Sequence, residues 1–256
     1  MGETVVVQGG QEEEIRRMTA PLSVVIPTLN VAGKLPETID ALLEGVRAEL
    51  VRELIICDGG SDDETVALAD QLGAVIIHTP PGRGLQLQRG AAVARGEWHL
   101  FLHADSVLEQ GWSDIVFRHI AGRTDRAGYF DLRFTGQGFV STWFAAWANM
   151  RSRWLSLPYG DQGLLIHRDL FSSVGGYQTI PLMEDVALSR RLRGHLTSLH
   201  CHATTGMESY TERGWFLGGC RNLGLLILYF LGVSPNRLVN WYVSDRSKIS
   251  TPAPDR

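Results

Sequence analysis

The chain has 256 residues, of which 44% are hydrophobic and 20% are charged, and its formal net charge is −4. This length suits one large α/β domain or two small ones, and the composition is ordinary for a folded domain in water. The negative net charge argues against nucleic-acid binding as the main function. The three cysteines have no metal-ligand spacing, so we expect free thiols in a reducing, cytoplasmic compartment.

Both ends of the chain are predicted to lie outside the folded domain. Residues 1–20 are polar and acidic and lack the apolar core of a signal peptide, which indicates a flexible extension. Residues 247–256 contain two prolines and are expected to be disordered. No repeat and no linker interrupts the remainder, so residues 21–246 are predicted to form one domain.

Three apolar runs in the first half each end in a polar or acidic loop, which is typical of buried parallel strands. They are residues 22–27 before Asn30, 54–57 before Asp58, and 98–102 before His103 and Asp105. Ligands of open α/β sheets bind outside the carboxyl ends of the strands. Asn30, Asp58 and Asp105 are therefore expected to converge on one edge of one sheet.

Helical patterns alternate with these runs. Residues 35–50 carry apolar positions at helical spacing, with Pro36 in the first turn. Residues 61–64 have the form of a capping box, in which Ser61 would cap the second helix. Residues 74–78 are predicted to form a further strand and residues 85–94 a short helix. The series predicts an α/β fold with a mostly parallel central sheet and helices on both faces.

The second half changes character. Residues 128–134 alternate between apolar and polar side chains, which predicts a half-buried strand at an antiparallel end of the sheet. Residues 164–166 are a further short strand, and Glu184 opens a helix that runs through Leu192. A helical stripe of apolar residues is expected to pack in the core, and it consists of Phe139, Trp143, Ala146, Trp147 and Met150.

The longest apolar run, residues 223–233, opens the predicted helical C-terminal segment. It is too short to cross a bilayer, which needs about 20 apolar residues. A buried helix is the favoured interpretation. The alternative is that residues 215–233 dock on a membrane surface, which would place the chain peripherally at the inner face of the membrane.

Taken together, these motifs resemble glycosyltransferase family 2, whose members have the Rossmann-like GT-A fold. The resemblance covers about residues 22–195 and is carried by residues 24–30, 58–65, 103–105, 175–177 and 183–191. It implies an inverting transfer of a sugar from a nucleotide-sugar donor to a hydroxyl acceptor, with a divalent cation, Mn²⁺ or Mg²⁺. Residues 229–235 are similar to a small bacterial subgroup of the family. The residues alone would have indicated only a nucleotide-and-metal site.

The resemblance assigns the donor side of the site to the first loops. Pro27, Thr28, Asn30 and Asp58 would bind the nucleotide-sugar, with Asp58 bonding the nucleoside. The alternative is that Asp58 only shapes its turn; since Ser61 would already supply the helix cap, the ligand role is favoured. Arg83, in a glycine-containing loop, is expected to contact the diphosphate, although a solvated surface arginine has the same pattern.

The metal motif departs from the family pattern. Asp105 matches the family's metal ligand, whereas His103 stands where the family has an aspartate. Residues two apart on an extended segment face the same way, so both side chains are expected to reach one ion. Imidazole suits Mn²⁺ better than Mg²⁺. His103 is therefore either a second metal ligand, a phosphate donor, or a hydrogen-bonded core histidine.

The resemblance places the catalytic acids at the start of a helix. Asp185 matches the general base that deprotonates the acceptor hydroxyl, and Glu184 is the second candidate. The alternative is that both acids only stabilise the positive end of the helix. Asp161 would either orient the acceptor or close a turn. Arg213 or Tyr210 would close over the phosphates.

Two other functions remain open. A nucleotidyltransferase that makes a sugar-nucleotide needs a basic, glycine-rich first loop, but residues 27–33 contain one glycine and no basic residue. A non-catalytic nucleotide-sugar-binding module is disfavoured because Asp58, Asp105 and Asp185 are all present. The sugar, the nucleobase, the acceptor and the oligomeric state do not follow from the sequence.

Overall fold

The computed structural model describes residues 20–136, 138–206, 215–239 and 241. Apart from Ala20, the predicted N-terminal extension lies outside the described residues, as does the predicted tail over residues 247–256. Tyr210 and Arg213 also lie outside them. Their expected position over the phosphates therefore stays a prediction.

The first half of the chain alternates strands and helices in the predicted order. Its elements are β1 (Leu22–Thr28), α2 (Leu35–Arg47), β2 (Val51–Asp58), α3 (Thr65–Gln71), β3 (Val75–His78), α4 (Arg83–Val93) and β4 (Trp98–Phe101). Strand β1 pairs in parallel with both β2 and β4, and β2 pairs in parallel with β3. Because β4 lies on the opposite side of β1 from β2, the carboxyl ends of β1 and β4 form a topological switch point.

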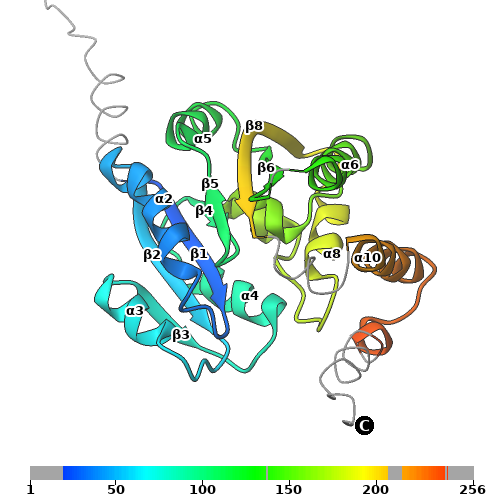
Figure 1. Ribbon diagram of the computed structural model, residues 1–256. Coiled ribbons are helices and arrows are strands. Elements are labelled where there is room, and N and C mark those ends of the chain that lie inside the picture. The colour runs from blue at the N-terminus through cyan, green and yellow to red at the C-terminus, as the bar shows by residue number, and fades with distance from the viewer. Residues whose placement is uncertain (1–19, 137, 207–214, 240, 242–256) are drawn as a thin grey trace, which may run out of the picture.

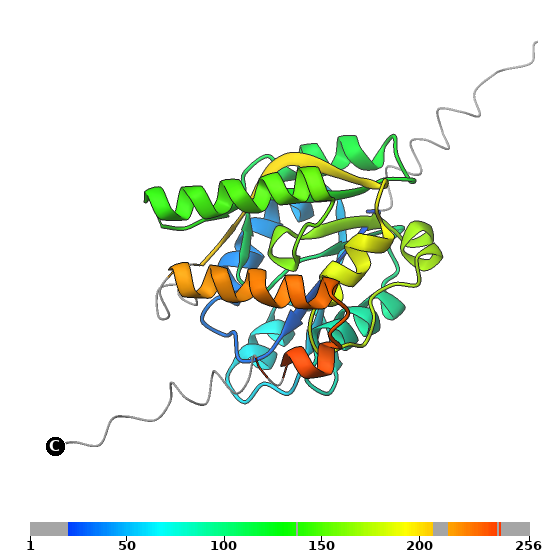
Figure 2. The ribbon, with the colours of Figure 1, turned by 90° about the vertical axis from the view of Figure 1, so that its right-hand side faces the viewer.

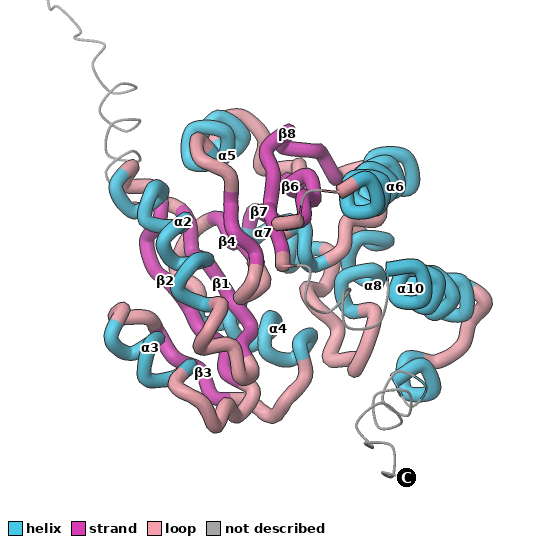
Figure 3. The backbone as a smooth tube through the Cα atoms, viewed as in Figure 1, coloured by secondary structure: helices cyan, strands magenta, loops and turns pink. Residues whose placement is uncertain are grey.

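The second half completes a mixed sheet. Its elements are β5 (Ser106–Leu108), α5 (Trp112–Ile120), β6 (Ala127–Phe134), α6 (Phe139–Leu155), the 3₁₀ turn η1 (Gly160–Gln162), β7 (Leu164–His167), α7 (Arg168–Ser173), α8 (Glu184–Arg191), β8 (Leu196–Thr205) and α10 (Trp215–Phe230). The strand order is β3-β2-β1-β4-β7-β6-β8-β5. Figure 3 shows the parallel strands β3, β2, β1 and β4 in this order. The predicted antiparallel pairing of β6 is confirmed with β7, whereas β6 and β8 are parallel.

Helices cover both faces of the sheet (Figure 1), and strand alternation builds a core on each face. Val24 and Ile26 of β1 pack in the cluster that contains residues of α2 and α5. Val25, between them, packs in the cluster that contains residues of α4, α7 and α8. On the second face α4 approaches closely, since a Cβ at Gly90 would lie 2.4 Å from Val25 Cγ1. This close packing carries the first residues of α4 to the edge where β1 and β4 end.

Helix α6 corrects two predictions. Strand β6 is not half-buried, because α6 covers its second face and leaves Tyr129 and Asp131 only 3% and 4% exposed. The aromatic stripe is not in the core: Trp143 is 56% exposed, and Trp147 is 39% exposed. The inward side of the helix is mixed instead. Phe144 and Ala148 pack on Leu132 and Phe134, and Asn149 exchanges hydrogen bonds of 2.7 and 3.1 Å with the backbone of Leu132.

Over residues 223–230, helix α10 is buried on one face only, so the prediction of a buried helix is wrong for its other face. Leu226 packs with Leu157 and Val186, whereas Leu223 and Ile227 are 43% and 50% exposed. Across the described ranges, no helix combines the length and the apolar content needed to span a bilayer.

Candidate active site

Asp58 organises the loop at the end of β2. Its carboxylate accepts hydrogen bonds from Thr28 Oγ1 (3.0 Å), from Ser61 Oγ (2.5 Å), and from the backbone N–H groups of Gly60 (2.9 Å) and Ser61 (2.8 Å). Burial on its own would raise the pKa of Asp58, but these hydrogen bonds outweigh it and hold the pKa below its ordinary value. The carboxylate therefore ties the end of β1 to the loop after β2.

The loop after β1 is joined to the same structure through Asn30. Its N–H donates to Ser61 Oγ at 2.9 Å, and its Oδ1 accepts from the N–H of Asp62 at 2.9 Å. Asn30 has a φ of +53°, in the left-handed region that asparagine tolerates better than most residues. Asn30 and Asp58 therefore converge on one edge, as predicted.

Ser61 does not cap α3, which corrects the predicted capping box. The helix begins at Thr65 after Glu64, and the Ser61 hydroxyl is bonded to Asp58 instead. Asp63 Oδ1 accepts from the N–H of Thr65 at 3.0 Å. Asp58 therefore has the turn-shaping role that was the alternative, and Ser61 does not supply the helix cap. The contact of Asp58 with a nucleoside stays a prediction.

Gln86 of α4 is a part of this edge that the sequence did not reveal. It is 5% exposed, and its Nε2 donates to the backbone oxygens of Thr28 (2.8 Å) and Cys57 (2.7 Å). These bonds hold the ends of β1 and β2 at a fixed separation. No pattern distinguishes Gln86 from Gln88, which lies two positions further along the same helix.

A second group of residues surrounds a small cavity beside the end of β4. Arg83, the first residue of α4, lines it together with His103, Glu184 and Asp185. The remaining lining residues are Leu87, Phe101, Leu102, Gly160, Leu164 and Tyr177. The cavity has a volume of about 10 Å³, which is room for about one water molecule. The fold thus brings four of the predicted site residues together, while Asp105 does not line this cavity.

Burial and neighbouring carboxyls disfavour the ionisation of Glu184 and of Asp161. Glu184 is 4% exposed, and burial, followed by the neighbouring Asp185, raises the pKa of Glu184 to about 7. Arg83 Nη1, at 3.6 Å from Glu184 Oε1, acts in the opposite direction. Burial, with Asp185 and Asp105 adding to it, also raises the pKa of Asp161 to about 6. Such shifts at grouped carboxyls are typical of functional sites.

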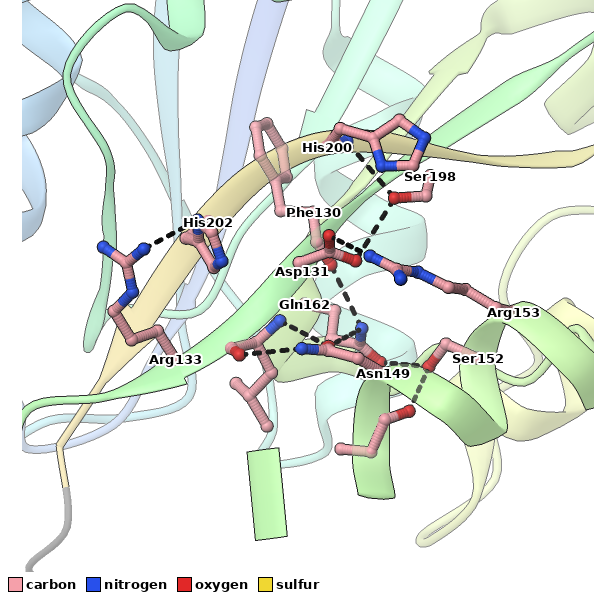
Figure 4. Close-up of polar contacts among 12 residues, drawn as sticks. Phe130, Asp131, Arg133, Asn149, Ser152, Arg153, Gln162, Ser198, His200 and His202 are labelled. Carbon is pink, nitrogen blue, oxygen red and sulfur yellow. Dashed lines mark hydrogen bonds and ion pairs between the residues drawn. The ribbon is translucent and has the colours of Figure 1, made fainter. Parts of the chain in front are cut away.

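Two anchors hold the η1 turn in place. Asp185 Oδ2 accepts from the N–H of Gly160 at 2.9 Å, which fastens the turn to the start of α8. Gln162 is fully buried; its Oε1 accepts from Ser152 Oγ at 2.5 Å, and its Nε2 donates to Phe130 O at 3.1 Å (Figure 4). Asp161 lies between these anchors. The sequence singled out Asp161 but not Gln162, the residue that positions it.

His103 is held neutral beside this turn. Burial, with Arg83 contributing, lowers the pKa of His103 well below its ordinary value. Its Nε2 is shielded from solvent and has no hydrogen-bond partner among the described residues. A Cβ at Gly160 would lie 2.4 Å from that nitrogen, so the position needs glycine.

The segment from His103 to Asp105 is not extended. The N–H of Ser106 donates to His103 O at 3.2 Å and closes a turn, so strand alternation does not set where the two side chains point. In the described part of the chain, no group of three or more His, Cys, Asp or Glu side chains is arranged to hold a metal ion.

The fold and the acid-bearing edge define a Rossmann-like α/β protein of the GT-A type. Residues 23–172 match the family model described as "Glycosyl transferase family 2". The chain therefore belongs to glycosyl transferase family 2, and the predicted family is confirmed.

Curated relatives match part of the chain. A "PGL/p-HBAD biosynthesis glycosyltransferase" of Mycobacterium bovis is 41% identical over 140 residues, which are 45% of this chain and 54% of the relative. A "Glucosyl-3-phosphoglycerate synthase" of Mycolicibacterium smegmatis is 37% identical over 98 residues, which are 34% of this chain and 31% of the relative. The chain thus spans about half the length of the first relative and less of the second.

Solved structures share the fold. Glucosyl-3-phosphoglycerate synthase of Mycobacterium tuberculosis, in complex with Mn²⁺, UDP and glucosyl-3-phosphoglycerate, superposes with a TM-score of 0.53 at 22% identity over 80% of this chain and 77% of that one. TarS of S. aureus superposes with a TM-score of 0.55 at 15% identity over 72% and 60% of the two chains. The predicted fold class is confirmed.

We expect Asp58→Ala to lower the free energy of unfolding by roughly 2–3 kcal/mol, because several donors lose a charged acceptor. Urea unfolding measures the change. Asp62→Ala, at an exposed position in the same loop, is the matched control and should change stability by less than about 0.5 kcal/mol. Equal stabilities for the Asp58 variant and the wild type would contradict the organising role.

Stability should fall as the pH rises from about 4.5 to about 7, because Glu184 ionises near 4.5 in the unfolded chain and near 7 in the folded one. Glu184→Gln removes this loss. The free energy of unfolding of the variant, relative to that of the wild type, should therefore rise by up to about 3 kcal/mol across this pH range. Urea unfolding at several pH values measures the gain. Glu64→Gln, at an exposed carboxyl, is the control. A constant difference between Glu184→Gln and wild type would refute the raised pKa.

Proposed function

We propose that the chain is an inverting glycosyltransferase that moves a sugar from a nucleotide-sugar to a hydroxyl acceptor. The observation that carries the proposal is the gathering of Arg83, His103, Glu184 and Asp185 around one cavity beside the switch point. An arginine next to two carboxyls at the carboxyl edge of parallel strands can serve both an anionic leaving group and a proton transfer. Membership of glycosyl transferase family 2 supports the same chemistry.

The donor site is assigned to the loops after β1 and β2, which hydrogen bonds join. Pro27 and Thr28 end β1, and Asn30 follows it. Asp58 accepts a hydrogen bond from Thr28, and Asn30 accepts one from Asp62 of the loop after β2. We infer that the nucleoside lies against these loops and that Arg83, whose side chain is 51% exposed, contacts the diphosphate. Structural neighbours were solved with Mn²⁺, UDP and UDP-glucose, which makes a UDP-sugar the first donor to test.

We infer that Asp105 would hold a divalent cation, with His103 as the candidate for a second ligand. His103 is neutral, as a metal-bound imidazole must be, and its buried Nε2 has no partner in the described residues. Two protein ligands suffice where phosphate oxygens and water complete the coordination. When bound, the cation neutralises charge that develops on the diphosphate leaving group.

Asp185 is the proposed general base. It takes the proton from the acceptor hydroxyl while that oxygen bonds to the anomeric carbon and the nucleoside diphosphate leaves from the opposite face. Hydrogen bonds from the N–H groups of Gly160 and Val186 fix the orientation of the Asp185 carboxylate. Glu184 stays the second candidate, since a pKa of about 7 suits a base at neutral pH. Asp161, on the adjoining turn, would orient the acceptor.

UDP should stabilise the protein only with Mn²⁺ or Mg²⁺ present, by about 2.7 kcal/mol when its concentration is a hundred times the Kd. Calorimetry with added metal, compared with EDTA, measures this stabilisation. Asp105→Asn should abolish the difference, whereas Asp62→Asn should preserve it. Equal stabilisation by UDP in EDTA would contradict the proposed role of the cation. The absence of stabilisation by any nucleotide would contradict the proposed donor site.

Asp185→Asn should reduce sugar transfer by about 10²-fold or more while leaving UDP affinity near wild type, because an amide cannot accept the proton. The assay is donor hydrolysis and transfer to a panel of simple sugars and lipids, with Glu184→Gln measured beside it. Wild-type transfer by Asp185→Asn together with an inactive Glu184→Gln would move the base to Glu184. Full activity of both variants would mean that the two acids only stabilise the helix end, and Asp161 would be tested next.

A further inference from the structure

An exposed apolar stripe runs along α6. Its residues recur at intervals of four, three and four, so they lie on one face of the helix. They are Trp143, Trp147, Met150 and Trp154, with exposed fractions of 56%, 39%, 40% and 81%. Three exposed tryptophans on one helix are unusual, since large apolar side chains of a folded domain are mostly buried.

Helix α10 carries a second stripe at the same spacing. Leu223, Ile227 and Phe230 are 43%, 50% and 47% exposed, and Leu231 continues the stripe at 75%. The opposite face of α10 is buried through Leu225 and Leu226. The exposed stripe is therefore what remains after the helix has packed on the domain.

The two helices lie on the same side of the molecule. Figure 1 shows α6 and α10 at the right-hand side, and Figure 2 shows both running across the face turned toward the viewer. Between them lie α8 and the segment that follows α6, where Leu157, Val186 and Leu226 form one cluster. We call the exposed stripes of α6 and α10 the tryptophan-leucine face.

This face lacks acidic residues. Helices α6 and α10, which carry the stripes, contain no Asp or Glu, although the whole chain has a net charge of −4. Exposed arginines border the stripes: Arg153 precedes Trp154, and the Arg190 guanidinium lies 5.1 Å from the centre of the Phe230 ring. Arg153 forms an ion pair with Asp131, whose side chain is 5% exposed, whereas the arginine is 46% exposed and keeps contact with solvent.

We propose that the tryptophan-leucine face binds the surface of an anionic lipid bilayer. Tryptophan rings favour the boundary between headgroups and acyl chains, and arginines at the rim attract anionic headgroups. A second copy of the chain fits less well, since two such faces would bring their arginine rims together. The proposal goes beyond the transferase activity and does not rest on it.

Vesicle sedimentation of the full chain tests the proposal with phosphatidylcholine vesicles that contain or lack phosphatidylglycerol. We expect binding to the anionic vesicles, with a blue shift of tryptophan fluorescence, and weaker binding at high salt. The double variant Trp147→Ala/Trp154→Ala should bind at least about tenfold more weakly. Phe117→Ala removes a 46% exposed aromatic on α5, away from this face, and should bind as the wild type does.

Circular dichroism and the Tm of each variant show whether the fold is kept; since the two tryptophans are exposed, both readouts should match the wild type. Failure of the wild-type chain to bind either vesicle would overturn the proposal, as would unchanged binding by a folded double variant. Light scattering after size exclusion tests the other occupant, a second copy of the chain. If the wild type is a dimer, the double variant is a monomer and neither binds vesicles, the face serves self-association and the proposal is overturned.

Discussion

The buried side-chain amide of Gln162 is the contact on which the candidate site depends most. Its oxygen and nitrogen connect the η1 turn to Ser152 of α6 and to Phe130 of β6 (Figure 4). A buried amide that loses such partners costs more free energy than a typical surface contact provides, so the turn has one stable arrangement. Asp161 and the Gly160 N–H that bonds to Asp185 are positioned as a consequence.

This arrangement concentrates negative charge, and the fold offsets it from two sides. Burial and the nearby Asp185 raise the pKa values of both Asp161 and Glu184. Arg83 approaches from α4, and Arg151 approaches from α6, where it is 8% exposed and its guanidinium lies 3.3 Å from the centre of the Tyr159 ring. A group of acids balanced in this way changes protonation readily when a charged ligand arrives, which is what proton transfer near neutral pH requires.

The sequence predicted the parallel half of the sheet well, because a strand buried on both faces must be apolar along its length and polar where it leaves the sheet. It failed where the deciding partner is distant in sequence. Ser61 has the local pattern of a helix cap, but its hydroxyl accepts from the N–H of Asn30, 31 residues earlier in the chain, and donates to Asp58 of its own loop. Periodicity found the stripe of α6 but not which face is buried, because Asn149 bonds to the backbone of β6, 17 residues earlier in the chain.

Helix α6 joins the candidate site to the tryptophan-leucine face. Its inner side combines hydrogen bonds to β6 and η1 with the packing of Phe144 and Ala148 on β6, and its tryptophans are left on the outside. Helix α10 packs on Val186 and beside Met183, which flank the two acids at the start of α8. The elements that hold Asp161 and Asp185 therefore also carry the exposed stripes. A bilayer bound by those stripes would lie alongside the candidate site, where an acceptor hydroxyl at the headgroup level would be within the reach of a transferase.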